Sequence, residues 1–184
     1  MSRVAVILFN LGGPDGPEAV RPFLRNLFSD PAILRVPALL RRPLAAAIAG
    51  RRAVAAREIY AKLGGGSPLL PNTIAQAEAL ESALDDAEEV RAFPCMRYWH
   101  PRAEAVAAEV KAFAPARLVL LPLYPQFSTT TTASSLADWQ AAAKRAGIAV
   151  PASAVCCYPT EPGFIAALAD GIRRALEQSG RSHP

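Results

Sequence analysis

The stretch LVLLPLYPQFSTTTTASS, residues 118–135, carries the strongest indication of the fold. It begins with an uninterrupted apolar run, which is typical of a central strand buried on both faces of a sheet. Prolines and a string of hydroxyl residues follow, and they predict a loop that leads into a helix. Ligands of α/β proteins bind beyond the carboxyl ends of parallel strands, so the candidates to line a pocket are Tyr124, Gln126, Phe127 and Ser128. A purely connecting loop before a capped helix is the alternative interpretation.

Strands and helices alternate on both sides of this stretch. Apolar runs bounded by turn residues predict strands over residues 4–10, 90–96, 117–123 and 148–157. Helical spacing predicts helices over residues 18–28, 73–86, 102–113, 135–146 and 162–178. One or two further helices are expected within residues 37–63, where Pro43 and Gly50 suggest a break, and Asn72 is the expected cap of the helix that follows. This alternation predicts an α/β fold with a mainly parallel sheet of about four strands, covered by helices on both faces.

The length and composition are those of one globular domain. The chain has 184 residues, of which 52% are hydrophobic and 20% are charged. Such a chain is long enough for one sizeable core and too short for two typical domains. We therefore expect one lobe over residues 1–178, and a disordered tail or a truncation point at residues 179–184.

The net charge of +4 is concentrated in one basic segment. Its arginines are Arg35, Arg41, Arg42, Arg51, Arg52 and Arg57. Because a guanidinium group binds carboxylate or phosphate with two hydrogen bonds, these arginines favour a small acidic substrate or an anionic membrane surface. Residues 36–52 can form a basic amphipathic helix, which suggests peripheral membrane contact. Nucleic acid is not an expected partner, because the segment lacks interleaved aromatic residues and no known binding module is present.

The cysteines indicate a reducing compartment. Cys95, Cys156 and Cys157 are odd in number and show no CxxC spacing, which argues against a disulfide framework and against a closed zinc site. We therefore predict a cytoplasmic protein without a bound metal of its own. The first apolar run, residues 4–11, is too short to cross a bilayer or to act as a secretory signal, so a soluble chain is expected.

Four loops are expected to meet at the carboxyl edge of the sheet. They cover residues 11–17, 97–101, 124–132 and 158–162. Arg97 and Tyr98 follow their strand directly and are therefore expected at this edge. His100 precedes a proline and has no nearby histidine, so a structural hydrogen-bonding role is a better interpretation than a catalytic base.

A second glycine-rich motif, GGGSP at residues 64–68, follows a helix, so the rule for strand ends does not place it. Its glycines would let the backbone approach a ligand, with the hydroxyl of Ser67 as a hydrogen-bond donor. Nucleotide binding is an alternative for such loops. It is disfavoured here, because no GxGxxG motif follows the first strand and GGGSP lacks the lysine and the spacing of a Walker loop.

Four segments together resemble the amino-terminal half of ferrochelatase. In chain order they are LFNLGGPDGPEAVRPFLRNLFSD, RRAVAAREIYAKLGGGSPL, MRYWHP and LPLYPQFSTTTTASSL. The resemblance implies a Rossmann-like three-layer lobe, one of two in the family, with the porphyrin bound in the cleft between them. It implies a lyase of haem biosynthesis that inserts Fe²⁺, as a substrate, into protoporphyrin IX. A porphyrin is a broad apolar disc with two propionates, so its site needs an apolar wall and cationic or hydroxyl donors.

The same resemblance assigns apolar residues to the porphyrin pocket. Leu11 matches the pocket residue just before GGP, where the coproporphyrin-using branch of the family has a tyrosine. Leucine at this position therefore favours protoporphyrin. Leu24, Leu27 and Ile33 match the apolar lip of the pocket.

Polar and aromatic site residues are assigned in the same way. Arg52, Tyr60 and Ser67 match residues that bind the propionates or line the edge of the pocket. Arg97 and Tyr98 match the pair that lines the cavity near the metal.

The chain departs from the family pattern at two points. Thr129 stands where animal and some bacterial members have a cysteine that binds an iron–sulfur cluster, so no cluster of that type is expected. The catalytic histidine of an SAHGLP-like motif and its partner glutamate would lie beyond Pro184, in a missing carboxy-terminal lobe. We therefore expect a fragment that binds porphyrin weakly at most and is inactive alone. A non-catalytic porphyrin- or haem-binding module is the alternative.

Overall fold

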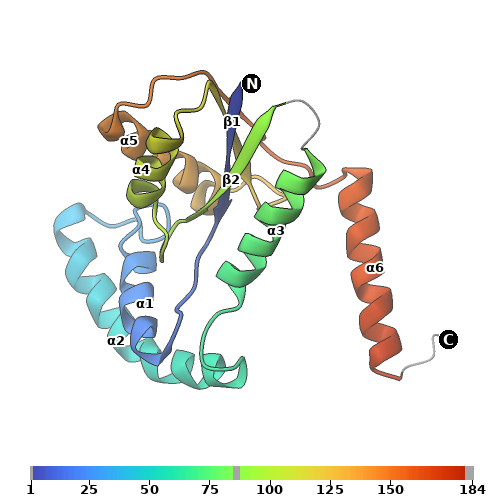
Figure 1. Ribbon diagram of the computed structural model, residues 1–184. Coiled ribbons are helices and arrows are strands. Elements are labelled where there is room, and N and C mark those ends of the chain that lie inside the picture. The colour runs from blue at the N-terminus through green and yellow to red at the C-terminus, as the bar shows by residue number, and fades with distance from the viewer. Residues whose placement is uncertain (1, 85–87, 181–184) are drawn as a thin grey trace.

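The computed structural model of the protein describes residues 2–84 and 88–180 (Figure 1). Within these residues four strands form one parallel sheet in the order β2-β1-β3-β4. The strands are β1 (Arg3–Asn10), β2 (Glu89–Met96), β3 (Arg117–Pro122) and β4 (Ala152–Ala154). The predicted α/β fold with a mainly parallel sheet is confirmed.

β1 is one of the two inner strands of the sheet, and its side chains from Val4 to Phe9 are all buried. Successive side chains point to opposite faces of the sheet. Ala5, Ile7 and Phe9 join the core on one face, and Val6 and Leu8 join the core on the other. β1 is therefore the strand that is buried on both faces.

The apolar run in β3 is less deeply buried than the sequence predicts. Leu118 and Leu120 are buried, but Val119 and Leu121, on the opposite face, are only half-buried. These two line a shallow apolar groove beside α3 (Leu69–Ala83), since no described helix covers that part of the sheet. The prediction of a strand buried on both faces was correct for one face of β3 only.

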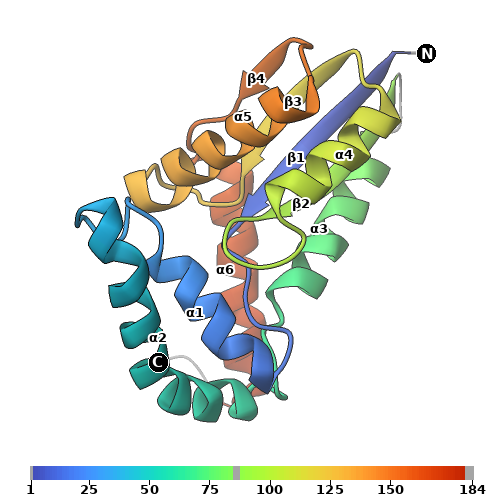
Figure 2. The ribbon, with the colours of Figure 1, turned by 90° about the vertical axis from the view of Figure 1, so that its left-hand side faces the viewer.

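Helices cover both faces of the sheet and produce three layers (Figure 2). On one face lie α4 (Ala103–Phe113) and α5 (Ser134–Ala146), which enclose the larger core. Trp139 of α5 meets Phe9 of β1 edge to face there, with ring centroids 6.2 Å apart. On the other face α3 packs through Ala77 against the side chains of β1 and β2.

A separate helical pair lies at the carboxyl ends of the strands (Figure 2). It consists of α1 (Val20–Phe28), preceded by a short 3₁₀ turn at Pro17–Ala19, and α2 (Ala38–Lys62). The two helices share a core of their own that includes Tyr98 from the loop after β2. This pair places its side chains at the edge where parallel sheets bind ligands.

The expected break in the basic segment is wrong, because α2 runs without interruption through Pro43 and Gly50. Pro43 lies near the amino-terminal end of the helix and is exposed, so it removes one hydrogen bond in a region that water can solvate. Ala49 and Ala53 are buried against Val20, Phe23 and Leu24 of α1, and this packing stabilises the helix.

The expected cap at Asn72 is also wrong. Helix α3 begins at Leu69, and Asn72 lies inside its first turn. The hydroxyl of Ser67 accepts a hydrogen bond from the N–H of Leu69, and Pro71 is tolerated because the first turn of a helix leaves its N–H groups without partners. The end expected for this helix, near residue 86, lies outside the described residues.

Two further segments differ from their predicted bounds. The strand expected over residues 148–157 is reduced to β4, which pairs with β3 through three residues at the edge of the sheet. Thr129–Ala133, expected as a loop, forms a π-helical turn that runs into α5. The hydroxyl of Ser128 caps this turn by accepting a hydrogen bond from the N–H of Thr130.

The last described helix, α6 (Pro162–Gln178), agrees with its prediction and lies apart from the rest of the lobe (Figure 1). It buries no side chain, and its exposed apolar residues are Ile165, Leu168 and Ile172. Among the described helices none is both long and apolar enough to cross a bilayer. Most of the predicted tail, residues 181–184, lies outside the described residues.

Candidate functional site

The loops after β1 and β2 lie side by side at the carboxyl edge. The N–H of Arg97 donates to the carbonyl of Asn10 at 2.9 Å, and the N–H of Tyr98 donates to the carbonyl of Leu11 at 3.0 Å. These bonds continue the pairing of the two strands into their loops. Arg97, Tyr98 and Leu11 are therefore placed together by the register of the sheet.

The GGGSP motif reaches the same edge. The N–H of Ser67 donates to the carbonyl of Pro14 at 2.7 Å, so the turn after α2 lies against the LGGP loop after β1. The contact is close, because a Cβ atom on Gly13 would lie 2.4 Å from both Cβ and Oγ of Ser67. Only glycine at residue 13 allows this approach.

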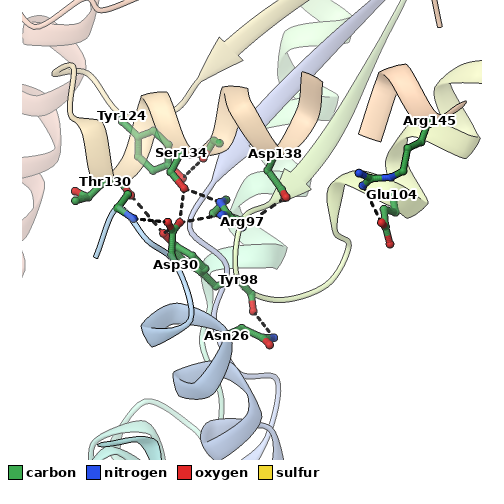
Figure 3. Close-up of polar contacts among 12 residues, drawn as sticks. Asn26, Asp30, Arg97, Tyr98, Glu104, Tyr124, Thr130, Ser134, Asp138 and Arg145 are labelled. Atoms are coloured by element: carbon green, nitrogen blue, oxygen red, sulfur yellow. Dashed lines mark hydrogen bonds and ion pairs between the residues drawn. The ribbon is translucent and has the colours of Figure 1, made fainter. Parts of the chain in front are cut away.

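A buried carboxylate, Asp30, organises the polar centre of the edge (Figure 3). One of its oxygens, Oδ2, accepts hydrogen bonds from Arg97 Nη2 at 2.8 Å and from the hydroxyl of Tyr98 at 2.8 Å. The hydroxyl of Ser134 donates to the same oxygen. The other oxygen accepts from the N–H of Ala32 at 2.7 Å. The carboxylate thus joins α1 to the loop after β2 and to the start of α5.

The network keeps Asp30 ionised. Burial by itself would raise the pKa of this carboxyl group, but the hydrogen bonds from Ser134, Ala32 and Tyr98 and the charge of Arg97 outweigh burial, and the pKa lies below its ordinary value. Burial and the bond to Asp30 raise the pKa of Tyr98 well above that of a free tyrosine. At neutral pH the pair is therefore a carboxylate that accepts and a phenol that donates.

Arg97 is held between two carboxylates. Besides the bond to Asp30, its Nη1 lies 3.5 Å from Oδ2 of Asp138 on α5, and its Nε donates to Ser134 Oγ at 2.7 Å. Its guanidinium group is mostly buried. The charge of Arg97 is thus balanced within the protein.

Tyr124, from the loop after β3, lies next to Ser134 at the start of α5 (Figure 3). Its hydroxyl is 3.4 Å from Ser135 Oγ. Burial raises the pKa of Tyr124 to about 12 despite the hydrogen bond to Ser135, so the phenol stays protonated at neutral pH. Gln126 and Phe127 of the same loop are exposed, and Ser128 caps the π-helical turn.

The four apolar residues that the resemblance assigns to the pocket come together with Tyr60 in the core shared by α1 and α2. One apolar cluster contains Leu11, Leu24, Leu27, Ile33 and Tyr60. All except Leu24 are only partly buried, so they present apolar surface beside the edge. Burial raises the pKa of the Tyr60 phenol.

The remaining assigned residues lie around this cluster in different settings. Arg52 is exposed on α2, with its guanidinium carbon 5.7 Å from the ring centre of Phe28. Ser67 is half-buried against the LGGP loop. Tyr98 is only 1% exposed. In this structure it therefore packs in the core shared by α1 and α2 and binds Asp30, and it does not face solvent.

Sequence reasoning missed Asp30, Ser134 and Asp138. In the sequence Asp30 belongs to Ser-Asp-Pro, which indicates only the end of a helix, and the two others belong to a helix start and a helix surface. Asp30 is 67 residues from Arg97 and 104 from Ser134 in the chain. No local spacing indicates contacts over such distances.

The side chains of His100 and Thr129, two positions considered for proton or metal chemistry, are not among the hydrogen-bond partners of Asp30, Arg97 or Tyr98. His100 is exposed and its ring packs on Trp99, with centroids 5.1 Å apart. Thr129 is exposed at the start of the π-helical turn. Across residues 2–84 and 88–180, His, Cys, Asp and Glu side chains do not gather in groups of three that would suit a metal ion.

Comparison with known proteins identifies related sequences along the whole chain. The family model named Ferrochelatase matches residues 3–184. A ferrochelatase from Caulobacter vibrioides (strain NA1000 / CB15N) is 57% identical over 181 residues, covering 97% of this chain and 51% of that protein. The ferrochelatase of Phenylobacterium zucineum is 56% identical over 182 residues, covering 97% and 52%. That of Pelagibacter ubique is 51% identical over 166 residues, covering 89% and 48%. The chain spans about half the length of these curated relatives.

Proposed function

Because this chain belongs to the ferrochelatase family, we propose that it forms the porphyrin-holding wall of a lyase that inserts Fe²⁺ into protoporphyrin IX during haem synthesis. The observation that carries the proposal is the apolar cluster of Leu11, Leu24, Leu27, Ile33 and Tyr60 at the ligand-binding edge of the sheet. Half-buried apolar side chains of this kind suit the flat face of a macrocycle.

The polar residues around the cluster suit the propionates. Arg52 is exposed next to the cluster and offers a guanidinium group that can bind a carboxylate with two hydrogen bonds. The hydroxyls of Tyr60 and Ser67 are neutral donors for the same groups. Leu11 offers no hydrogen bond to a further carboxylate, which favours protoporphyrin over more acidic porphyrins.

We propose that the wall does not itself remove the pyrrole protons. Tyr98 and Tyr124 have raised pKa values and keep their protons at neutral pH. Asp30 has a lowered pKa and already accepts several hydrogen bonds, which makes it a weak base. The base is therefore proposed to lie in the carboxy-terminal half that the relatives possess, and this stretch alone is proposed to be inactive.

The proposal includes no iron–sulfur cluster at residue 129. Such clusters are held by cysteine thiolates, and the hydroxyl of Thr129 is a poor replacement. Iron enters the proposed reaction as a substrate only.

We further propose a cytoplasmic protein that contacts a membrane through the start of α2. Leu39, Leu40 and Leu44 are 88%, 58% and 40% exposed, and the basic side chains of Arg35 and Arg42 lie nearby in the chain. Apolar residues beside cations are typical of helices that lie in an anionic lipid surface.

Vesicle flotation tests the membrane proposal. The double substitution Leu39→Ser and Leu40→Ser should reduce binding to vesicles of phosphatidylcholine and phosphatidylglycerol by about tenfold or more, because two exposed leucines no longer enter the lipid. Val54→Ser, which removes an apolar side chain that is about as exposed as Leu40 and lies further along α2, is the control. Equal binding of both variants would refute the proposal.

Titration with protoporphyrin IX, followed by quenching of tryptophan fluorescence, tests the proposed function. Arg52→Ala should weaken binding about tenfold or more, because a charge-assisted hydrogen bond to a propionate is lost. Leu27→Glu should weaken it at least as much, because a carboxylate in the wall must be desolvated and repels the propionates. Arg51→Ala, which removes a neighbouring exposed arginine, should have little effect.

The outcome can contradict either part of the proposal. Binding that is unaffected by Arg52→Ala and Leu27→Glu would show that the porphyrin does not lie on this wall. Insertion of zinc or iron by a protein carrying this stretch alone, dependent on added porphyrin, would show that the wall contains its own base.

A further inference from the structure

An open pocket, whose arginines are exposed to solvent, lies between α1 and α2 and is not part of the proposed porphyrin wall. Its volume is ≈ 520 Å³. The polar residues that line it are Arg21, Arg25, Asn26, Ser29 and Arg42, and small side chains such as Ala46 form the rest. None of the residues assigned to the porphyrin lines this pocket.

The three arginines of the pocket point to an anionic ligand. Arg21 and Arg25 are four residues apart and therefore lie on the same face of α1, and Arg42 faces them from α2. Arg21 reaches across the gap, since its Nη2 lies 3.9 Å from where a Cβ atom on Gly50 would be. Three like charges lining one pocket repel one another unless an anion lies between them.

No acidic side chain of the described residues makes an ion pair with these three arginines. Two other arginines of α2 do have partners. Arg41 donates to the carbonyls of Leu34 and Val36, and Arg57 lies 3.7 Å from Glu18. The three arginines of the pocket thus keep their hydrogen-bonding capacity for a ligand.

The backbone around the pocket is held in place. The side-chain amide of Asn26 donates to the carbonyl of Tyr98 at 3.1 Å, and the hydroxyl of Ser29 donates to the carbonyl of Arg25 at 2.6 Å. α1 also packs on α2 through Phe23, Leu24 and Ala49. A ligand would thus meet arginines on two helices whose relative position is already fixed.

We propose that this pocket binds a phosphate group. Guanidinium groups bind phosphate oxygens with paired hydrogen bonds, and three of them can surround a tetrahedral anion with more than one negative charge. The volume is within the range of small-molecule pockets and exceeds that of inorganic phosphate, so an organic group attached to the phosphate can also enter. The phosphate can belong to a soluble ester or to the headgroup of an anionic lipid. This site is independent of the proposed porphyrin chemistry.

Titration of the protein with inorganic phosphate at constant ionic strength, followed by ³¹P NMR, tests the site. Arg25→Gln and Arg42→Gln should each weaken binding about tenfold or more, because each removes a charge-assisted contact. Arg51→Gln is the matched control, since it removes the same charge from an exposed position on α2 that does not line the pocket. Circular dichroism checks that each variant is folded.

The result separates a site from general attraction to a basic surface. Saturable binding that Arg25→Gln and Arg42→Gln weaken and Arg51→Gln does not would support the pocket. Absence of saturation up to about 10 mM phosphate, or equal losses in all three variants, would overturn it.

A second arm distinguishes the two sources of phosphate. Phosphatidylglycerol vesicles should bind the protein less well after Arg25→Gln, and inorganic phosphate should compete, if the pocket takes a lipid headgroup. If flotation is unchanged while phosphate binding is lost, the pocket serves a soluble phosphate ester. Protoporphyrin titration of the same variants should be unchanged, so a failure of this proposal is distinct from a failure of the proposed function.

Discussion

Replacing Asp30 with asparagine is expected to lower the free energy of unfolding by about 3–5 kcal/mol. The substitution leaves the mostly buried guanidinium group of Arg97 without its closest carboxylate. It also replaces a carboxylate, one oxygen of which accepts hydrogen bonds from Tyr98 and Ser134, by an amide. The amide has one accepting oxygen where the carboxylate has two. Urea unfolding at neutral pH measures the loss.

Asp138→Asn is the matched control for this prediction. Asp138 also faces Arg97, but at 3.5 Å and with a more exposed side chain, so its removal should cost about 1 kcal/mol or less. A loss from Asp30→Asn no larger than that from Asp138→Asn would show that Asp30 does not organise the edge.

The stability difference between wild type and Asp30→Asn should also depend on pH. Because the pKa of Asp30 is lower in the folded protein than its ordinary value of 3.8, its contribution to stability is present above that value and is lost as the pH falls through the folded pKa. The difference in stability between wild type and Asp30→Asn should therefore be constant near neutral pH and shrink below about pH 4. A difference that grows on acidification would contradict the assigned direction of the shift.

Gly12→Ala is the second change with a large expected effect, a loss of about 2–4 kcal/mol. Gly12 has a φ of +81°, which an alanine adopts only with strain. A Cβ atom there would also lie 3.0 Å from the backbone nitrogen of Trp99 and 3.1 Å from Cβ of Met96. These atoms belong to the end of β2 and its loop, so they cannot move aside without disturbing the edge.

Gly16→Ala provides the control for the same loop. Gly16 has an extended backbone with φ of −173°, and an added Cβ would meet no atom within 4 Å. This change should leave the midpoint of thermal unfolding unaltered or slightly raised, because alanine restricts the unfolded chain. Protoporphyrin binding should weaken in Gly12→Ala and not in Gly16→Ala. Equal stability of the two variants would show that the LGGP loop tolerates a side chain at residue 12.

Much of the fold was predictable because its signals are local. The two inner strands, β1 and β3, are short apolar runs that end in turn residues, and most helices show their apolar spacing directly. The errors also have local causes. Asn72 is a good cap by residue type, but Ser67 and Pro68 start α3 one turn earlier. Pro43 usually interrupts a helix, but here it lies near an exposed helix end.

The candidate site was predictable only in part. The motifs LGGP, GGGSP and MRYWHP were recognised, and the rule for strand ends placed two of them at one edge. The contact between Gly13 and Ser67, which brings GGGSP to the same edge, follows from the way α2 and its turn fold back. Asp30 was missed because its ionised, buried state depends on residues from two distant segments, the loop after β2 and the start of α5.

The sequence by itself determined the alternation of strands and helices, the parallel sheet and the membership of a family, because these depend on periodicity and on strings of neighbouring residues. Only the tertiary structure decided which charges are paired. Arg97 lies between two buried or half-buried carboxylates, whereas Arg21, Arg25 and Arg42 face a pocket without one. The physical reason is that an ion pair needs two groups within a few ångströms, and the packing of distant segments sets that distance.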